Sequence, residues 1–166
     1  MPEENKFDEL IHLAPYDGSE ESESLFLQSL QEELIFHYDH NEFYRHFCER
    51  KNFNPYDQIT SLKSIPPVSV SVFKELGFKL SSVPREDLTL TLQSSATSGV
   101  PSTIMVDKVT SKRQAKAMVK VVGDFIGKDR KPFLVMDIDP RSEHKNLLGA
   151  RFAAVIGYLK FASGVG

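Results

Sequence analysis

Hydroxyl-bearing side chains are concentrated between Gln93 and Ile104, where the sequence reads QSSATSGVPSTI. This stretch contains four serines, two threonines, one glycine and one proline. Such a loop can present side-chain O–H and backbone N–H donors together, and its small side chains let phosphate oxygens approach the main chain. The chemistry that fits this composition is the binding of a nucleotide triphosphate, although a plain serine-rich hairpin turn has the same composition.

The stretch does not match the two glycine motifs that most often hold nucleotides. A Walker A loop, GxxxxGK[ST], needs a lysine and a second glycine that are absent here, and no dinucleotide-binding GxGxxG occurs in the chain. Composition alone therefore leaves phosphate binding and a simple turn both open.

Three histidines, His37, His40 and His46, lie within ten residues of one another and raise the question of a metal site. Their helical spacing provides no third ligand in register, and several aromatic residues lie among them. This pattern is more typical of an aromatic packing face, and we predict no metal site.

Two charged patterns also have a chemical and a structural interpretation. Asp137 and Asp139 would share one face of a strand and could bind magnesium, but the turn-forming sequence DIDP is a sufficient explanation, and we favour it. Lys112, Lys116 and Lys120 form an i, i+4 stripe that could meet an acidic partner, although a solvated helix face is its usual meaning.

Cys48 is the only cysteine, so an intrachain disulfide is excluded. Its basic neighbours could lower the thiol pKa, but no oriented base can be recognised beside it, and we predict a structural role.

The chain does not open on a basic and then apolar signal segment, which favours a cytoplasmic location. A net charge of -3 and a pI near 6.0 argue against nucleic-acid binding.

The first part of the chain divides into a lead-in and a helical segment. Residues 1–18 mix charge with proline and glycine and show no sustained period, so we expect them to be poorly ordered. Residues 19–64 begin at Ser19 with acidic residues, which suit the first turn of a helix, and continue with leucines at helical spacing. A second helix is expected after Asp39.

Strands and helices alternate in residues 65–166. A short helix should end at Gly77, and the alternating sequence DLTLTLQSS and the sequence STIMVD indicate strands on either side of the serine-rich stretch. An amphipathic helix is expected from Thr110 as N-cap, and PFLVMDID reads as a strand covered on both faces. This alternation indicates an α/β fold.

The C-terminal run NLLGARFAAVIGYLKFASGVG has roughly the length of a membrane-spanning helix. Arg151 and Lys160 interrupt it, and small residues between Gly149 and Gly157 favour close helix packing. We predict a buried helix and no membrane insertion. If this apolar segment were left uncovered, it could instead drive homo-oligomerisation.

The order of residues in SSATSGVPS resembles the signature loop SSGTTGxP of the adenylate-forming enzymes, with Ala96 and Ser98 as departures. IPPVSVSVFKELGFKLSSVP, STIMVDKVTSKRQ and FIGKDRKPFLVMDIDP resemble one branch of that superfamily, the acyl-protein synthetases of bacterial bioluminescence, also called long-chain-fatty-acid luciferin-component ligases. The resemblance covers roughly Ile65 to Phe161, and the N-terminal helices more loosely.

This resemblance implies that ATP, with Mg²⁺, activates a fatty acid or another carboxylic acid to an acyl-adenylate, and that the acyl group then passes to a thiol. An acyl-accepting protein or a reductase subunit would be the partner. The implied phosphate cradle consists of Ser94, Ser95, Thr97, Ser98 and Gly99. Ser102 stands where other branches commonly have a lysine. No catalytic residue is assigned.

Two features of the chain weigh on this expectation. If the family's glycine at this position has a positive φ, Ala96 would cost on the order of 1 kcal/mol in backbone strain. If the glycine lets the phosphate approach the main chain closely, the Ala96 side chain would block that approach. The family's adenine-binding motifs, catalytic lysine and acyl-accepting cysteine lie beyond the length of this chain. We therefore expect the helical N-terminal segment and an incomplete part of the large N-terminal domain, unable to complete the reaction alone. The alternative is an inactive interaction module that retains the fold.

Overall fold

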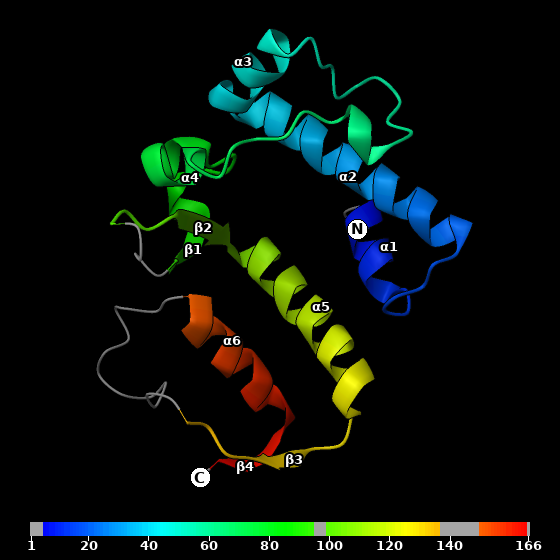
Figure 1. Ribbon diagram of the computed structural model, residues 1–166, viewed down its shortest axis with the longest axis vertical. Coiled ribbons are helices and arrows are strands. Elements are labelled where there is room, and N and C mark those ends of the chain that lie inside the picture. Colours follow the sequence, from blue (N-terminus) through cyan, green and yellow to red (C-terminus); the bar gives the residue numbers. More distant parts are fainter. Residues whose placement is uncertain (1–4, 95–98, 137–149, 166) are drawn as a thin grey trace. The chain divides into compact units, whose positions relative to one another are not determined.

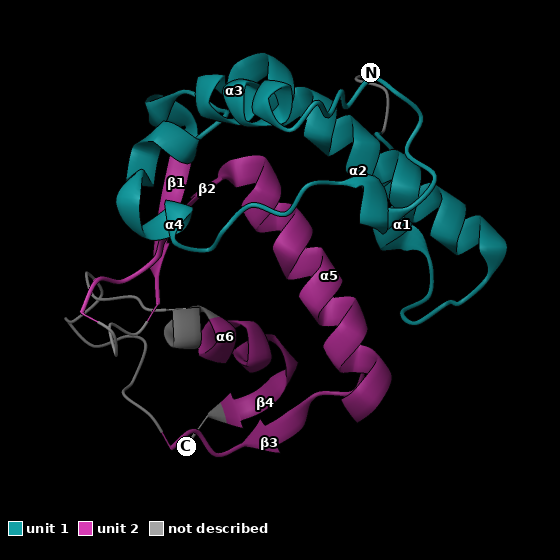
Figure 2. Ribbon diagram, turned by 45° about the horizontal axis from the view of Figure 1, so that its top comes forward, with its two compact units in different colours: residues 1–87 teal, residues 88–166 magenta. Residues whose placement is uncertain are grey.

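The computed structural model describes residues 5–94, 99–136 and 150–165, which form helices and two small sheets of the α/β class (Figure 1). The chain divides into two compact units, residues 1–87 and residues 88–166 (Figure 2). The boundary that we predicted between residues 64 and 65 differs from this division. The IPP segment and the short helix after it belong to unit 1.

Unit 1 is helical in its described part. Its α-helices are α1 (Lys6–His12), α2 (Glu20–His40), α3 (Glu42–Arg50) and α4 (Val72–Glu75), and short 3-10 helices lie at Leu62–Ser64, Gly77–Leu80 and Arg85–Asp87. α2 begins after Ser19, as predicted, and the Ser19 hydroxyl accepts a hydrogen bond from the Ser22 amide at 3.1 Å. α3 confirms the second helix expected after Asp39.

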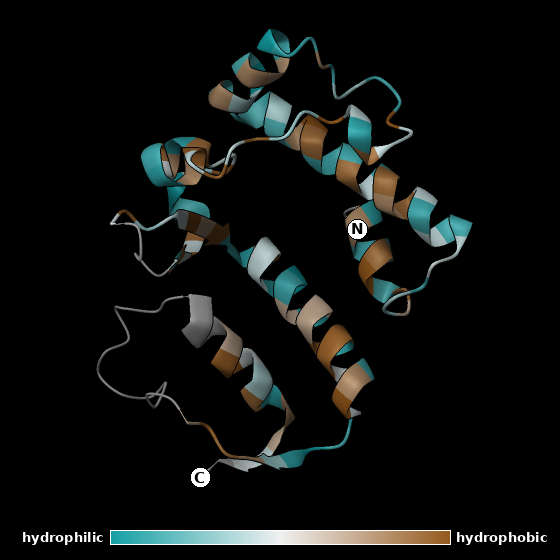
Figure 3. Cartoon of the chain, in the orientation of Figure 1, coloured by the Kyte–Doolittle hydropathy of each residue, from teal (hydrophilic) through white to brown (hydrophobic). Residues whose placement is uncertain are grey.

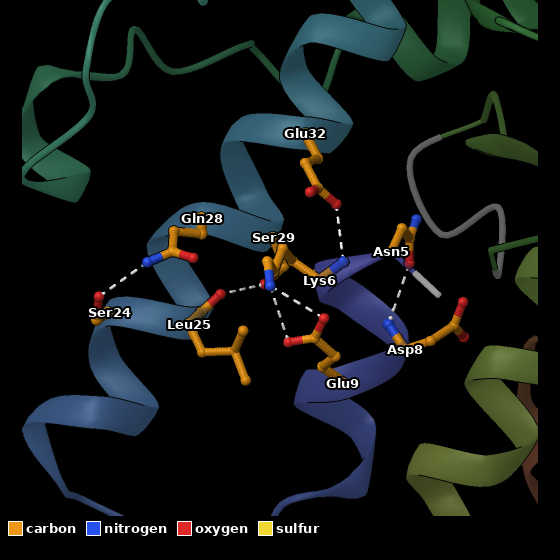
Figure 4. Close-up of polar contacts among 9 residues, drawn as sticks. All are labelled: Asn5, Lys6, Asp8, Glu9, Ser24, Leu25, Gln28, Ser29 and Glu32. Atoms are coloured by element: carbon orange, nitrogen blue, oxygen red, sulfur yellow. Dashed lines mark hydrogen bonds and ion pairs between the residues drawn. The ribbon is translucent and has the colours of Figure 1, made fainter. Parts of the chain in front are cut away.

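Helix α1 corrects the expectation that residues 1–18 are poorly ordered throughout. The Asn5 side chain caps α1 by accepting a hydrogen bond from the Asp8 amide at 3.1 Å. The Lys6 backbone N–H donates to a carboxylate oxygen of Glu32 on α2 at 2.9 Å (Figure 4). A helix of this length is marginal by itself, so contacts with α2 contribute to its stability.

Ser29 lies on α2 and is 1% exposed. Its hydroxyl donates to the Leu25 carbonyl oxygen of its own helix at 2.7 Å (Figure 4). Because this bond satisfies the hydroxyl locally, Ser29 can be buried without an unpaired polar group.

Asn41 joins α2, α3 and the chain after α4. Its side chain is 4% exposed, and its Oδ1 accepts a hydrogen bond from the Tyr44 amide at 2.8 Å, which caps α3. Its Nδ2 donates to the carbonyl oxygens of Lys79 and Ser81, both at 3.0 Å. A single buried amide therefore caps one helix and holds a segment about forty residues further along the chain.

The C-terminal end of α2 is held by Arg45 of α3. The Arg45 side chain donates from Nε to the Tyr38 carbonyl oxygen at 3.0 Å and from Nη2 to that of Asp39 at 2.6 Å. The Tyr56 hydroxyl donates to the Asp39 carboxylate at 2.8 Å. The two Arg45 contacts satisfy backbone carbonyl groups that have no partner within the last turn of a helix.

The short helix expected before Gly77 is confirmed as α4. Gly77 has φ +50, the left-handed conformation that glycine adopts readily after a helix. It leads into the 3-10 helix whose Lys79 carbonyl is bound by Asn41.

The described part of unit 2 contains two strand pairs, two α-helices and a 3-10 helix. Its elements are β1 (Leu88–Gln93), β2 (Thr103–Asp107), α5 (Lys108–Ile126), β3 (Lys131–Phe133), α6 (Ala150–Tyr158), a 3-10 helix at Leu159–Phe161 and β4 (Ala162–Val165). β1 pairs antiparallel with β2, and β3 pairs parallel with β4. The leucines of β1 are half-buried and its alternate residues exposed, as the period-2 pattern predicted.

The N-cap of α5 is Asp107, and our assignment of Thr110 to that position was wrong. The Asp107 carboxylate accepts hydrogen bonds from the Thr110 amide at 2.7 Å and from the Thr110 hydroxyl at 3.2 Å. Aspartate is at least as strong an N-cap as threonine, and it is also the last residue of β2. The helix therefore follows the hairpin without an intervening loop.

The strand expected over PFLVMDID is shorter and more exposed than predicted. β3 ends at Phe133, and the side chains of Leu134 and Met136 are 79% and 92% exposed. The expectation of cover on both faces is therefore wrong for residues 131–136. Residues 137–139 lie outside the described residues.

Helix α6 confirms a helix in the C-terminal apolar run, but the helix is only partly buried. α5 and α6 run side by side (Figure 1), and Gly157 is buried where α6 meets Met118 of α5. Ile156 and Tyr158 are exposed. No helix in the described parts of the chain is long and apolar enough to cross a membrane.

We predict that replacing Asn41 destabilises unit 1. Asn41→Ala removes an N-cap, at about 1 kcal/mol, and two hydrogen bonds of about 1 kcal/mol each. The expected loss in the free energy of unfolding is therefore about 3 kcal/mol, measured by urea denaturation. Asn41→Ser is the control, because its hydroxyl can cap α3 but is too short to reach both carbonyls, and it should recover about 1 kcal/mol. A loss below about 0.5 kcal/mol for Asn41→Ala would contradict this role.

We also predict that Gly157 and Met118 are energetically coupled. A Cβ added at Gly157 would overlap the Met118 sulfur. In a Met118→Ala background, Gly157→Ala should stabilise the protein by about 1 kcal/mol through helix propensity. With Met118 present, the steric overlap should cancel that gain, so a double-mutant cycle should give a coupling of at least about 1 kcal/mol. Additive effects of the two substitutions would show that the helices do not approach closely here.

Candidate functional site

The serine-rich loop lies at the end of the β1–β2 hairpin. The Ser94 amide donates to the Ser102 carbonyl oxygen at 3.1 Å, and the Ser102 amide donates to Ser94 Oγ at 2.9 Å. These two bonds continue the hairpin by one step beyond the Gln93 and Thr103 pair. They bring the two ends of the loop together and fix the base from which residues 95–101 extend.

Two of the predicted phosphate ligands, Ser94 and Ser102, form this base. Ser94 is exposed and Ser102 is half-buried. Because the Ser94 oxygen accepts the Ser102 N–H, its own O–H keeps the capacity to donate a hydrogen bond. The Ser94 hydroxyl is therefore able to donate a hydrogen bond to an anion bound at the loop.

Gly99 stands in the same loop with φ +96, a conformation that residues with a side chain rarely adopt. Among the described residues, leaving out its two chain neighbours, no atom lies within 4 Å of the position that a Cβ would take at Gly99. The backbone conformation alone therefore favours glycine here. The other predicted ligands, Ser95, Thr97 and Ser98, lie outside the described residues, as does Ala96.

The sequence placed this loop between two strands, and the structure confirms that placement. A serine-rich hairpin turn was one of the interpretations left open, and β1 and β2 do pair as a hairpin. The closure of the loop by Ser94 and Ser102 was not foreseen. A clue was available, because two short alternating segments on either side of glycine and serine are typical of a hairpin. The role of the loop in binding phosphate stays a prediction.

His37 and His40 both pack against the Phe36 ring, as the predicted aromatic packing face requires. His37 Nδ1 is 2.6 Å from the Ser82 hydroxyl, His40 Nδ1 is 2.8 Å from the Phe36 carbonyl oxygen, and His46 is exposed on α3. Partial burial of its ring lowers the pKa of His37, and the charge of Glu33 opposes this effect. No group of three or more potential metal ligands occurs among the residues that the structure describes.

Cys48 is fully buried on α3, with 0% of its side chain exposed. Burial raises the pKa of the Cys48 thiol, and a hydrogen bond with Tyr44 only partly opposes this shift. Burial, together with the contact with Cys48, also raises the pKa of the Tyr44 hydroxyl. A protonated, inaccessible thiol is a poor nucleophile, in agreement with the structural role predicted for it.

The lysine stripe lies on α5. Lys112 and Lys116 are exposed and Lys120 is half-buried, which fits a largely solvated helix face. Asp137 and Asp139 fall outside the described residues, so their predicted roles stay predictions.

Comparison with known proteins matches the chain to a family model and to a curated protein. The family model described as "Acyl-protein synthetase, LuxE" matches residues 3–165. A long-chain-fatty-acid–luciferin-component ligase of Aliivibrio fischeri is 32% identical over 126 residues, which cover 73% of this chain and 32% of the relative. This chain spans about a third of the length of that relative. Since the family model covers nearly the whole sequence, the chain belongs to the LuxE family of acyl-protein synthetases.

Proposed function

We propose that this chain is the triphosphate-binding part of an acyl-protein synthetase that activates a fatty acid with ATP. The observation that carries the proposal is the serine-rich loop closed by Ser94 and Ser102 at the end of a hairpin, in a chain of this family. The name of the Aliivibrio fischeri relative, a ligase for a long-chain fatty acid, supports the choice of substrate. The resemblance of SSATSGVPS to the adenylate-forming signature supports the choice of ATP.

The proposed reaction has two steps, formation of an acyl-adenylate and transfer of the acyl group to a thiol. In the first, a carboxylate oxygen of the fatty acid attacks the α-phosphorus of ATP, forming an acyl–phosphate bond. The bond between the α-phosphorus and the bridging oxygen breaks, and pyrophosphate leaves. In the second, a thiol sulfur of the acceptor attacks the acyl carbonyl carbon, a thioester forms and AMP leaves, while the thiol proton passes to a base or to solvent.

The loop chemistry fits the first step. Pyrophosphate carries away negative charge, so donors held ready around the β- and γ-phosphates favour its departure. Ser94 and Ser102 bring hydroxyl and backbone groups together at the base of the loop, and Gly99 provides backbone without a side chain. Ser95, Thr97 and Ser98 would supply further O–H donors. Mg²⁺ would share the charge of the phosphate oxygens.

Cys48 is excluded as the acyl-accepting thiol of the second step. Its side chain is fully buried in unit 1 and its pKa is raised, so it cannot receive an acyl group without local unfolding. The acceptor must therefore be another thiol, either elsewhere in the synthetase or on a partner protein.

The proposal is tested by removing hydroxyls from the loop. In a full-length acyl-protein synthetase that carries this sequence, the Ser95→Ala and Thr97→Ala double variant should reduce fatty-acid-dependent ATP–pyrophosphate exchange about 100-fold or more, because each lost donor weakens charge stabilisation. Exchange reports the first step alone, independently of the acyl acceptor.

Thr91→Ala provides the control for this test. Thr91 is exposed on β1, close to the loop but outside it, and its replacement should leave the exchange rate within about twofold of the parent. If the double variant exchanged pyrophosphate as fast as Thr91→Ala, the loop would not be the phosphate site.

A further inference from the structure

Strand β1 contains one residue more than its regular pairing with β2 requires. Between Leu90 and Gln93, each residue of β1 lies opposite one residue of β2, and Leu90 lies opposite Val106. The next residue of β2, Asp107, lies opposite Leu88, so Thr89 is the extra residue of this step. An extra residue in one strand of an antiparallel pair is a β-bulge, and we call this step the Thr89 bulge.

A side-chain hydrogen bond crosses the Thr89 bulge. The Thr89 hydroxyl donates to the Val106 carbonyl oxygen at 3.3 Å. A bulge locally disrupts the ladder of backbone hydrogen bonds, so this hydroxyl links the two strands at the step where the regular ladder is broken. Val106 is 2% exposed, and the bond therefore ends on a buried residue.

The Thr89 bulge lies where the hairpin joins α5. Asp107, opposite Leu88, is both the last residue of β2 and the N-cap of α5. The direction in which the hairpin leaves the helix is therefore set at this step, because a bulge bends its strand and increases the local twist.

Helix α5 itself is held by contacts along its second half. That half carries most of the apolar residues of the helix (Figure 3). Met118 packs against Gly157 of α6, and a Cβ added at Gly123 would lie 3.6 Å from the ring of buried Phe161. With the helix fixed in this way, the bulge determines where the far end of the hairpin lies relative to the helix.

The length of the hairpin amplifies any change at the bulge. Ser94, at the base of the serine-rich loop, is five residues beyond Thr89. Five residues of strand span about 17 Å, so a change of about 10° in the bend would displace Ser94 by about 3 Å. Misplacement of a binding group by about 1 Å can cost about 100-fold in rate.

We propose that the Thr89 bulge aims the serine-rich loop at the triphosphate of ATP, and that Thr89 is a positioning residue for formation of the acyl-adenylate. Bulges are over-represented next to active sites, where they re-aim the residues that follow. Thr89 acts through the direction of the hairpin and does not itself bind ATP. This inference rests on the proposed function of the loop.

Replacement of Thr89 in a full-length acyl-protein synthetase that carries this sequence tests the proposal. Thr89→Val keeps the branched shape but loses the hydroxyl, and it should lower kcat/KM for Mg²⁺-ATP in pyrophosphate exchange about fivefold or more. The KM for the fatty acid should stay within about twofold of the parent, because the loop binds only ATP. Thr89→Ser keeps the hydroxyl and should restore kcat/KM to within about twofold.

The same substitution one step along the strand provides a matched control. Thr91 is exposed and lies in the regular pair with Met105, so Thr91→Val should exchange pyrophosphate within about twofold of the parent. Deletion of Thr89 removes the bulge, and it should lower kcat/KM for Mg²⁺-ATP about 100-fold. Circular dichroism shows whether the deletion variant folds, and if it does not, the comparison of Thr89→Val with Thr91→Val decides.

The outcomes separate this proposal from the function of the loop. Suppose that the Ser95→Ala and Thr97→Ala double variant loses exchange. Equal kcat/KM for Thr89→Val and Thr91→Val would then overturn the positioning role and leave the loop as the phosphate site. A Thr89→Ser variant as impaired as Thr89→Val would also overturn it, as would a loss of stability in Thr89→Val without a change in kcat/KM. Unchanged exchange in the double variant would overturn both proposals.

Discussion

The antiparallel pairing of β1 with β2 is the interaction on which unit 2 depends. It fixes the loop between the strands, because the last step of the hairpin is the mutual bonding of Ser94 and Ser102. It also fixes the start of α5, because Asp107 ends β2 and caps the helix. α5 in turn packs against α6 through the contact of Met118 with Gly157. A change in hairpin register would move the loop and the helix together.

Asn41 has the corresponding role in unit 1. One buried amide caps α3 and binds two carbonyl groups after α4. Such a group is stabilising only while all its partners are present, since a buried polar atom that loses its partner costs free energy. Unit 1 is therefore a scaffold of helices held by polar contacts at their ends. Its thiol is fully buried, and the described residues hold no group of three or more potential metal ligands.

Local patterns predicted most of the elements, and long-range contacts account for what was missed. Helices α2, α3 and α5 and strands β1 and β2 followed from periodicity. α1 was missed because part of its support comes from Glu32, far along the chain. The N-cap of α5 was placed at Thr110, which is a suitable N-cap residue, whereas the structure uses Asp107, which is also suitable. Residue type alone does not decide between two such positions three residues apart. The serine-rich loop was located from residue types alone, but its closure by Ser94 and Ser102 depends on strand pairing that composition does not encode.

The central claim is that residues 94–102 of this chain hold the triphosphate of ATP. Isothermal titration of Mg²⁺-ATP into this chain and into its Ala96→Gly variant tests it most directly. The account predicts saturable binding, tighter in Ala96→Gly, because glycine restores the family signature at this position and would relieve the strain or the block expected of alanine. Absence of binding by both proteins would contradict the claim that residues 94–102 of this chain suffice to hold the triphosphate. That result fits both a chain without the family's adenine-binding motifs and an interaction module that retains the fold without the ATP chemistry.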